Sequence, residues 1–267
     1  MAGQPDEPKN PASFEGRVAL VTGGGGDLGV AIGRRFREAG ATVILADVDG
    51  AKAEDAAARL AAQGPKARGP EARGIPMDVA DEASVTAAFA GVASRYGRLD
   101  VLVNNAGIAA RKASIELAVE DWARVLAVNL TGTFLCSRAA ARLMMAGGGG
   151  AIVNVASIMG LVGNALYANP AYHASKGGIV NLTRAHAAEW ARAGIRVNAI
   201  APTFVETTLT GRLLAEPGMR EGILSRTPMG RLAQPAEIAE AVAFLASDAA
   251  ALVTGVVMPI DGGWTAV

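Results

Sequence analysis

Short apolar runs alternate along this chain with longer stretches in which apolar residues recur at helical spacing. The short runs are apolar throughout, which is typical of strands buried on both faces of a sheet. The predicted strands are residues 17–22, 42–46, 75–77, 100–103, 151–156, 195–200 and 256–260. The predicted helices are residues 28–39, 51–62, 82–96, 119–145, 171–193 and 235–246.

This alternation of strand and helix predicts an α/β fold, a single-domain Rossmann-type doubly wound parallel sheet with helices on both faces. One domain over residues 14–267 is the simplest interpretation. Residues 1–13 are polar and proline-rich, and we expect a disordered tail there. Residues 64–74 predict a surface loop, and residues 202–228 form a mixed polar segment without a clear periodicity.

Composition narrows the function and the location. The 267 residues contain 25 Lys and Arg against 25 Asp and Glu, so no basic surface for nucleic acid is indicated. The single cysteine excludes an internal disulfide, and one cysteine with two histidines argues against a metal site. No apolar run reaches membrane-spanning length. We therefore expect a cytoplasmic protein.

A glycine turn, Gly23 to Gly26, follows the first predicted strand and opens the first helix. A helix N-terminus offers unpaired N–H groups and a partial positive charge, and glycines let the backbone approach a pyrophosphate. Asp47 stands eighteen residues after Gly29, at the end of the second strand. A carboxylate there can bind ribose hydroxyls and would repel a 2′-phosphate, which favours NAD over NADP.

Tyr172 and Lys176 are four residues apart in a predicted helix, so their side chains leave the same face. A phenol with a pKa near 10 is a poor base at neutral pH. A neighbouring ammonium group favours the phenolate and should lower the pKa of the tyrosine. The pair suits acid–base chemistry on an alcohol or a ketone.

Seven further sequence elements surround this pair in a characteristic order. They are TGGGGDLG (22–29), MDV (77–79), NNAG (104–107), VNL (128–130), Ser157 in NVASIMG, PTFVET (202–207) and DGGW (261–264). Together with YHASK (172–176), these elements make the chain resemble a classical short-chain dehydrogenase/reductase. Within that family, the resemblance points to the polyol and sugar-alcohol dehydrogenases. The resemblance covers nearly the whole chain from Phe14.

The resemblance implies a set of functional residues. The catalytic residues would be Asn129, Ser157, Tyr172 and Lys176. Ser157 would fix the substrate oxygen, Lys176 would bind the nicotinamide ribose, and Asn129 would hold a water that links Lys176 to solvent. The cofactor contacts would be Gly23, Asp27, Leu28, Gly29, Asp47, Asp78, Val79, Asn105, Ala106, Gly107, Tyr172, Lys176, Pro202, Val205 and Thr207.

Three positions depart from the family pattern. Asp27 replaces the middle glycine of the turn, and we interpret it as the N-cap of the first helix. Thr203 replaces the glycine that usually follows Pro202. Ser157 and Tyr172 are fifteen residues apart, two more than is common, and the additional residues should border the substrate.

The leading hypothesis is an NAD-dependent oxidoreductase acting on a secondary alcohol or ketone, with polyols and sugars as first candidates because Asn164 and Asn169 offer polar amides. An alternative is a 3-oxoacyl-thioester reductase, against which Asp47 argues, because such enzymes usually take NADPH. A protein of another class, a catalytically silent NAD sensor, is the third possibility. By analogy with relatives, the helices near 120–145 and 171–193 should form a homotetramer or homodimer.

Overall fold

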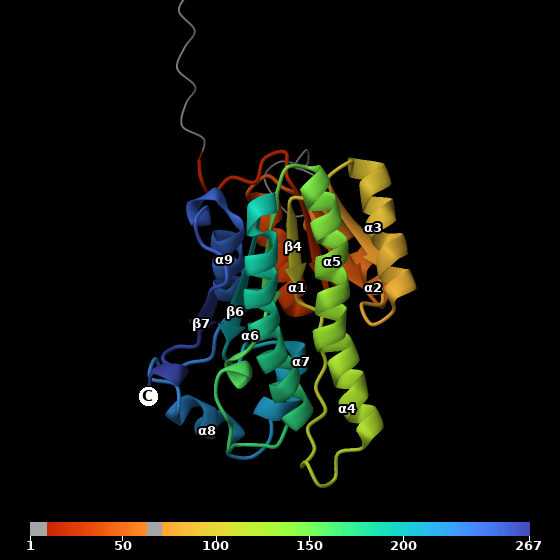
Figure 1. Cartoon of the computed structure of the whole chain (residues 1–267). Coiled ribbons are helices and arrows are strands. Elements are labelled where there is room, and N and C mark those ends of the chain that lie inside the picture. Colours follow the sequence, from red (N-terminus) through yellow and green to blue (C-terminus); the bar gives the residue numbers. More distant parts are fainter. Residues whose placement is uncertain (1–9, 63–70) are drawn as a thin grey trace, which may run out of the picture.

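The computed structural model describes residues 10–62 and 71–267 and contains the predicted sheet. Seven strands, all parallel, lie in the order β3-β2-β1-β4-β5-β6-β7 (Figure 1). Their bounds are Val18–Thr22 (β1), Thr42–Asp47 (β2), Ala72–Pro76 (β3), Val101–Asn104 (β4), Gly150–Val155 (β5), Ile195–Pro202 (β6) and Val257–Ile260 (β7). The prediction of a doubly wound parallel sheet is confirmed.

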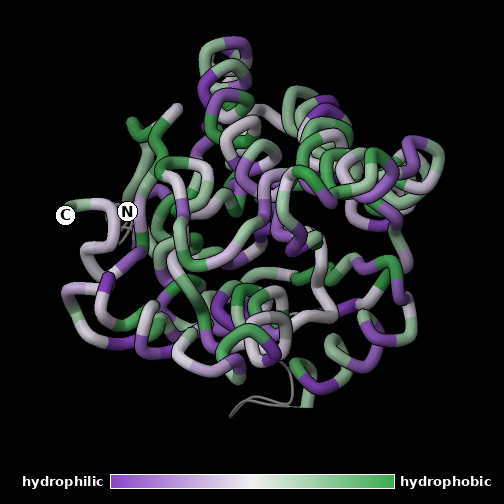
Figure 2. Tube along the Cα trace, turned by 90° about the horizontal axis from the view of Figure 1, so that it is seen from below, coloured by the Kyte–Doolittle hydropathy of each residue, from purple (hydrophilic) through white to green (hydrophobic). Residues whose placement is uncertain are grey.

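Helices cover both faces of the sheet, as the view along the strands shows (Figure 2). One face packs against α1 (Asp27–Glu38), α2 (Gly50–Ala62) and α9 (Pro235–Ala246). The other face packs against α3 (Glu82–Tyr96), α5 (Gly132–Ala146) and α6 (Pro170–Trp190). Three shorter helices lie toward the lower end in Figure 1: α4 (Val119–Leu126), α7 (Thr208–Leu214) and α8 (Met219–Ser225).

The uniformly apolar strands are explained by these two layers of helices. Leu20 and Val21, neighbours in β1, are fully buried on opposite faces and belong to different core clusters. Burying each such side chain stabilises the fold by about 1.5–3 kcal/mol. A polar residue at either position would therefore face a core rather than solvent.

Three predicted segments differ from the structure. The helix expected over 119–145 is interrupted by a π-helical turn, Ala127–Thr131, between α4 and α5. Residues 72–74, expected in a loop, instead extend β3 and pair with β2, while residues 63–70 lie outside the described part of the chain. In the expected tail, residues 1–9 are likewise outside it, and Ser13 donates to the Asn10 carbonyl in a turn.

Strands β1 and β4 are neighbours in the sheet, although the chain continues from them to opposite faces. The Thr22 hydroxyl at the end of β1 accepts hydrogen bonds from the N–H groups of Asn105 and Ala106, both at 3.0 Å. The Asn105 amide donates in return to the carbonyls of Thr22 and Gly23. Ligands of open α/β sheets bind at the crevice formed by such a reversal of strand order.

Residues 203–226, here called the α7–α8 segment, contain two helices that the polar pattern did not predict. Helix α7 begins with a reciprocal capping arrangement between Thr207 and Thr210. Phe204, Leu213 and Ile223 of this segment are buried in a separate apolar cluster with Ile158, Met159, Leu232 and Trp264. The segment is therefore packed against the end of the sheet rather than extended as a loop.

Candidate functional site

The glycine turn after β1 is too tightly packed for side chains. Gly23 has φ +62°, and a Cβ there would lie 3.0 Å from the Ala106 Cα. A Cβ at Gly29 would lie 2.3 Å from the Gly23 carbonyl oxygen. Gly26, the N-cap of α1, provides no side-chain cap, so no side chain covers the helix N-terminus there. The N–H groups of Gly24, Gly25 and Gly26 are donated within the protein, so a phosphate would be bound by the backbone N–H groups of the first turn of α1.

Asp47 lies at the end of β2, beside the glycine turn. Its carboxylate accepts hydrogen bonds from the N–H groups of Gly25, at 3.0 Å, and Asp49, at 3.2 Å. Lys52 is close to it, because a Cβ at Gly25 would lie 3.1 Å from the Lys52 Cγ and 3.2 Å from an Asp47 carboxylate oxygen. No sequence pattern identified Lys52. It lies in α2, and its position beside Asp47 depends on how this helix packs against the glycine turn.

Asp78 and Val79 follow β3 on the same side of the sheet. The Asp78 carboxylate accepts from the Ala80 N–H at 2.9 Å, and Val79 is buried against Gly132. A cleft of about 740 Å³ runs from Asp78 and Val48 along β3 and α3. Asp78 is therefore exposed to a space beside the expected nucleotide end of the site.

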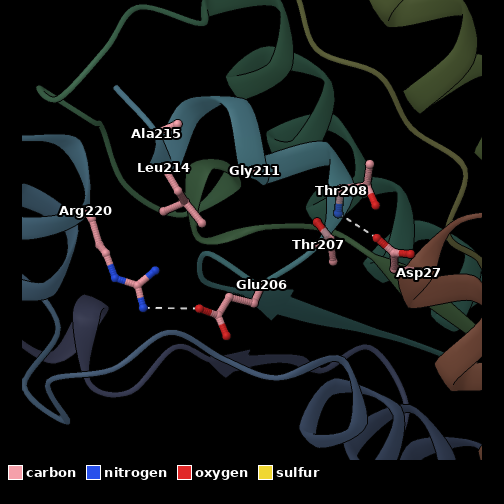
Figure 3. A pocket seen from close by; sticks show the side chains of 8 residues that line it. All are labelled: Asp27, Glu206, Thr207, Thr208, Gly211, Leu214, Ala215 and Arg220. Carbon is pink, nitrogen blue, oxygen red and sulfur yellow. Dashed lines mark hydrogen bonds and ion pairs between the residues drawn. The ribbon is translucent and has the colours of Figure 1, made fainter. Parts of the chain in front are cut away.

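Asp27 does not have the expected role. Gly26 has the extended backbone of an N-cap, φ −84° and ψ 161°, and Asp27 is the first residue inside α1. The Asp27 carboxylate instead accepts a hydrogen bond from the backbone N–H of Thr208, 2.6 Å away at the start of α7 (Figure 3). The N-cap prediction is wrong because that position belongs to the preceding residue, and the α7–α8 segment supplies another donor.

The Asp27–Thr208 hydrogen bond borders a cleft of about 560 Å³ between α1 and the α7–α8 segment. Arg220 of α8 forms a salt bridge of 3.2 Å with Glu206 in the same cleft (Figure 3). The N–H of Thr208 is the main cause that lowers the pKa of Asp27 below its ordinary value. The Asp27–Thr208 hydrogen bond thus links the α7–α8 segment to the glycine turn, while the Arg220–Glu206 salt bridge lies within the segment.

The structure brings Ser157, Tyr172 and Lys176 together at the ends of β5 and α6. Lys176 is buried, its Nζ donates to the Val155 carbonyl at 2.6 Å, and it lies 5.4 Å from the centre of the Tyr172 ring. Ser157 is also buried; its hydroxyl accepts from the Met159 N–H at 3.1 Å and lies near enough to the Tyr172 phenol to act on its pKa. The predicted proximity of these three side chains is therefore present.

Burial dominates the protonation of this group. It raises the pKa of Tyr172 to about 12, although the Ser157 hydroxyl and the charge of Arg111 act to lower it. Burial also lowers the pKa of Lys176 to about 8. Without a cofactor, the pKa of Tyr172 is therefore raised, and our expectation that Lys176 lowers it is wrong. Removal from water disfavours both the Tyr172 phenolate and the Lys176 ammonium.

Asn129 lies in the π-helical turn and is completely buried. Its amide accepts from the Ile108 N–H at 2.8 Å and donates to the Ile108 carbonyl and the Ser175 hydroxyl, both at 3.0 Å. A Cβ at Gly107 would lie 3.4 Å from the Asn129 Oδ1 and 3.7 Å from the Lys176 Nζ. Asn129, Gly107 and Lys176 therefore converge, and π-turns often mark functional sites.

The segment from Pro202 to Thr207 leaves the end of β6 beside this group. Pro202 pairs with β7, Val205 is buried and forms a bridge with Ala233, and Thr207 is the N-cap of α7. The Thr203 hydroxyl is buried and has no partner among the described residues. An unpaired buried hydroxyl is costly and is therefore a natural partner for a bound polar group.

Two residues named by the sequence and one that it missed border the substrate side. The Asn164 amide accepts from the Leu166 N–H at 3.0 Å, so it caps a turn, whereas the buried Asn169 Oδ1 has no described partner. Arg111 escaped the sequence reasoning. Its guanidinium lies 5.8 Å from the centre of the Tyr167 ring, and a loop position with no motif gave no signal for it.

The cradle of glycines, the uncovered helix N-terminus and the unpaired Thr203 hydroxyl fit a dinucleotide lying across the strand ends, with its reactive end beside Tyr172. The glycine turn would hold the pyrophosphate, Asp47 the ribose, and Lys176 the second ribose. Fold and site thus define a nicotinamide-dependent oxidoreductase.

Comparison with known proteins specifies this class. A family model described as enoyl-(acyl carrier protein) reductase matches residues 26–265. The chain is 47% identical to cis-4-hydroxycyclohexanecarboxylate dehydrogenase of Sinomonas cyclohexanicum over 96% of this chain and 99% of the relative. It is 46% identical to D-threitol dehydrogenase of Mycolicibacterium smegmatis, with 94% of each chain covered.

Among solved structures, a gluconate 5-dehydrogenase from Burkholderia cenocepacia J2315 in complex with NADP and tartrate superimposes with a TM-score of 0.90. It is 36% identical, and the match covers 96% of this chain and 98% of that one. The chain belongs to the short-chain dehydrogenase/reductase family, and it is an oxidoreductase that acts on CH–OH groups with a nicotinamide cofactor. None of the helices in the described residues is long and apolar enough to cross a membrane.

Proposed function

We propose that the protein catalyses the reversible, NAD-dependent oxidation of a secondary alcohol on a polyol, a sugar or a related small hydroxy compound. The observation that carries this proposal is the convergence of Ser157, Tyr172, Lys176 and Asn129 beside the glycine turn. These side chains come from three separate segments, and a purely structural role for all four would not require their convergence.

Tyr172 is the proton acceptor in the direction of oxidation. Its hydroxyl must lose a proton before it can take one from the alcohol, and burial raises its pKa to about 12. A bound oxidised nicotinamide would supply the hydride acceptor for the carbinol carbon and a positive charge that favours the Tyr172 phenolate. The Ser157 hydroxyl, which lies beside Tyr172, would donate to the substrate oxygen and hold it near the phenol.

Lys176 and Asn129 complete the arrangement. The Lys176 ammonium binds the nicotinamide ribose while it donates to the Val155 carbonyl. Because its pKa is about 8, Lys176 can release and regain a proton near neutral pH. Asn129 fixes the backbone at Ile108 through two hydrogen bonds, and we propose that it also orders a water beside Lys176.

Asp47 supports the preference for NAD over NADP. Its carboxylate is held by two backbone N–H groups at the edge of the expected ribose site, where it would repel a 2′-phosphate. Lys52 lies beside it and would attract the same phosphate. We therefore propose that the protein prefers NAD to NADP, and that Lys52 reduces this preference but does not reverse it.

The runner-up enzyme function is reduction of a 3-oxoacyl thioester. It is favoured by 39% identity over 94% of this chain to a 3-oxoacyl-[acyl-carrier-protein] reductase of Thermotoga maritima and opposed by Asp47, since such reductases usually take NADPH. A silent NAD sensor is a weaker candidate because all four catalytic candidates are present at the same end of the sheet. The names of the relatives, a hydroxylated ring acid dehydrogenase and a tetritol dehydrogenase, support a small hydroxy substrate.

We further propose a homotetramer, or a homodimer, in the cytoplasm. Phe134 of α5 is 39% exposed and lies 6.1 Å from the ring of His186 of α6. His186 in turn stacks on Trp190 at 4.1 Å. His186 and Trp190 are buried, so the exposed Phe134 ring is the part of this cluster that suits a subunit contact, and the single buried Cys136 suits a reducing compartment.

The test is turnover of a panel of polyols, sugars, cyclic alcohols and acyl thioesters with NAD(H) and with NADP(H), followed by the absorbance of the reduced cofactor. We expect oxidation of small secondary alcohols with NAD. Activity confined to acyl thioesters and NADPH would establish the runner-up. Cofactor binding without turnover of any compound would favour the sensor.

A further inference from the structure

Arg111 lies on the segment that follows the NNAG element and approaches the catalytic group from the substrate side. The start of this segment is firmly held, since Asn105 is bonded to the end of β1 and Ile108 accepts from and donates to Asn129. Arg111 comes three residues after Ile108 and is exposed. Its position is therefore set by the same contacts that set the cofactor site.

An aromatic row orients the Arg111 guanidinium. The guanidinium carbon is 5.8 Å from the centre of the Tyr167 ring, a cation–π contact. Tyr167 packs edge-on against Phe204 at 6.3 Å and lies in the same apolar cluster as Tyr172. The positive charge of Arg111 acts to lower the pKa of both tyrosines, although burial raises both overall. Arg111 thus lies within electrostatic reach of the Tyr172 hydroxyl.

No carboxylate in the described part of the chain forms a salt bridge with Arg111. Across residues 10–62 and 71–267, the salt bridges do not include Arg111, whereas the neighbouring Lys112 pairs with Asp121 at 2.9 Å. Glu206, an acid of the α7–α8 segment, already pairs with Arg220 and accepts from Gln234. A guanidinium is planar and suited to bidentate binding of a carboxylate.

We propose that Arg111 binds a carboxylate of the substrate, so that the preferred substrates are secondary alcohols that carry a carboxylate, such as hydroxylated ring acids or sugar acids. This inference rests on the proposed function and specifies its substrate class. Tyr167 and the apolar cluster around it would contact the carbon frame, and the carbinol would lie at Tyr172. An uncharged polyol has no group that would use the arginine.

The experiment compares two pairs of substrates that differ in the carboxylate: cis-4-hydroxycyclohexanecarboxylate against cis-4-methylcyclohexanol, and D-gluconate against D-glucitol. Arg111→Met, Arg111→Lys and the parent are measured with NAD and with NADP. Lys112→Met is the matched control, because it removes an adjacent cation that is paired away from the site. The readout is the ratio of kcat/KM for the charged and uncharged member of each pair, in which any effect on Tyr172 cancels.

We expect Arg111→Met to lower this ratio about 10- to 100-fold, as loss of a charge-assisted hydrogen bond predicts. Arg111→Lys should restore part of it through KM, and Lys112→Met should leave it unchanged. If the parent oxidises both members of each pair equally well, or if Arg111→Met keeps the ratio, the inference is overturned while the proposed function stands.

If none of the four alcohols is oxidised with either cofactor, that panel counts against the proposed function and not against Arg111. Binding of cyclohexanecarboxylate and of cyclohexanemethanol to the NADH-saturated protein then decides the inference by calorimetry. Carboxylate binding that is lost in Arg111→Met supports it, and equal binding of both probes, or of neither, overturns it.

Discussion

Replacing Asp27 by asparagine tests the contact between the glycine turn and the α7–α8 segment. In the parent, the Thr208 N–H lies 2.6 Å from the Asp27 carboxylate. Asparagine keeps an oxygen that can accept this hydrogen bond but removes the negative charge. Asp27→Ala removes the acceptor as well. Glu206→Gln is the matched control, because it weakens the Arg220 salt bridge of the same segment without altering the glycine turn.

The expected magnitude follows from the geometry. A hydrogen bond to a charged group contributes about 1.5–3 kcal/mol when buried, and we reduce this to about 1 kcal/mol because Asp27 is exposed to solvent. For a chain of this length, Asp27→Ala should lower Tm by roughly 2–4 °C. Since the pKa of Asp27 is lowered, this stability is present above the ordinary carboxyl pKa and is lost as the pH falls through the lower folded value.

Cofactor binding should change in the opposite direction. A carboxylate within several ångström of a pyrophosphate repels it by about 1 kcal/mol in water and by several-fold more in a partly dry cleft. We therefore expect Asp27→Asn to bind NAD about 3- to 10-fold more tightly, at nearly the parent Tm. One thermal titration with NAD measures both effects for all variants. Weaker NAD binding by Asp27→Asn would refute the reasoning and would show that the carboxylate supports the cofactor directly.

The remaining predictions concern the catalytic group and the cofactor preference. Tyr172→Phe should lower kcat by about 10²- to 10⁴-fold with NADH binding retained, and turnover within a few-fold of the parent would contradict the assignment. Asp47→Ser should weaken NAD binding and reduce the preference for NAD over NADP, whereas Lys52→Ala should increase that preference. A parent protein that prefers NADP would contradict both predictions. Because burial raises the pKa of Tyr172 to about 12, kcat/KM for oxidation should rise between pH 7 and 9, and a flat profile would count against this. Burial lowers the pKa of Lys176 to about 8 in the folded protein, so protonating Lys176 opposes folding. The free energy of unfolding of the parent should therefore fall by about 3 kcal/mol relative to Lys176→Met as the pH falls from 10.5 to 8, and should not change further below pH 8. Unfolding free energies of the two proteins that run parallel over this pH range would exclude this.

The sequence by itself determined the architecture and the family of the protein. Fully apolar runs such as Leu20–Val21 indicate strands covered on both faces. Successive residues of a strand point to opposite faces, so an apolar residue at every position requires burial on both. Gly23 has a positive φ and Gly29 packs against the Gly23 carbonyl within the same turn, so their spacing already indicates a tight glycine turn before α1. Tyr172 and Lys176 share a helix face by periodicity alone.

Tertiary structure decided which distant groups meet and how deeply they are buried. Asp27 accepts from Thr208, 181 positions away, and neither residue carries a local signal of the other. Arg111 reaches the Tyr167 ring only because the chain after β4 and the segment before α6 converge at one end of the sheet. The pKa of Tyr172 lies well above, not below, its ordinary value, because loss of water around a phenol depends on packing in three dimensions, which no spacing of residues along the chain records.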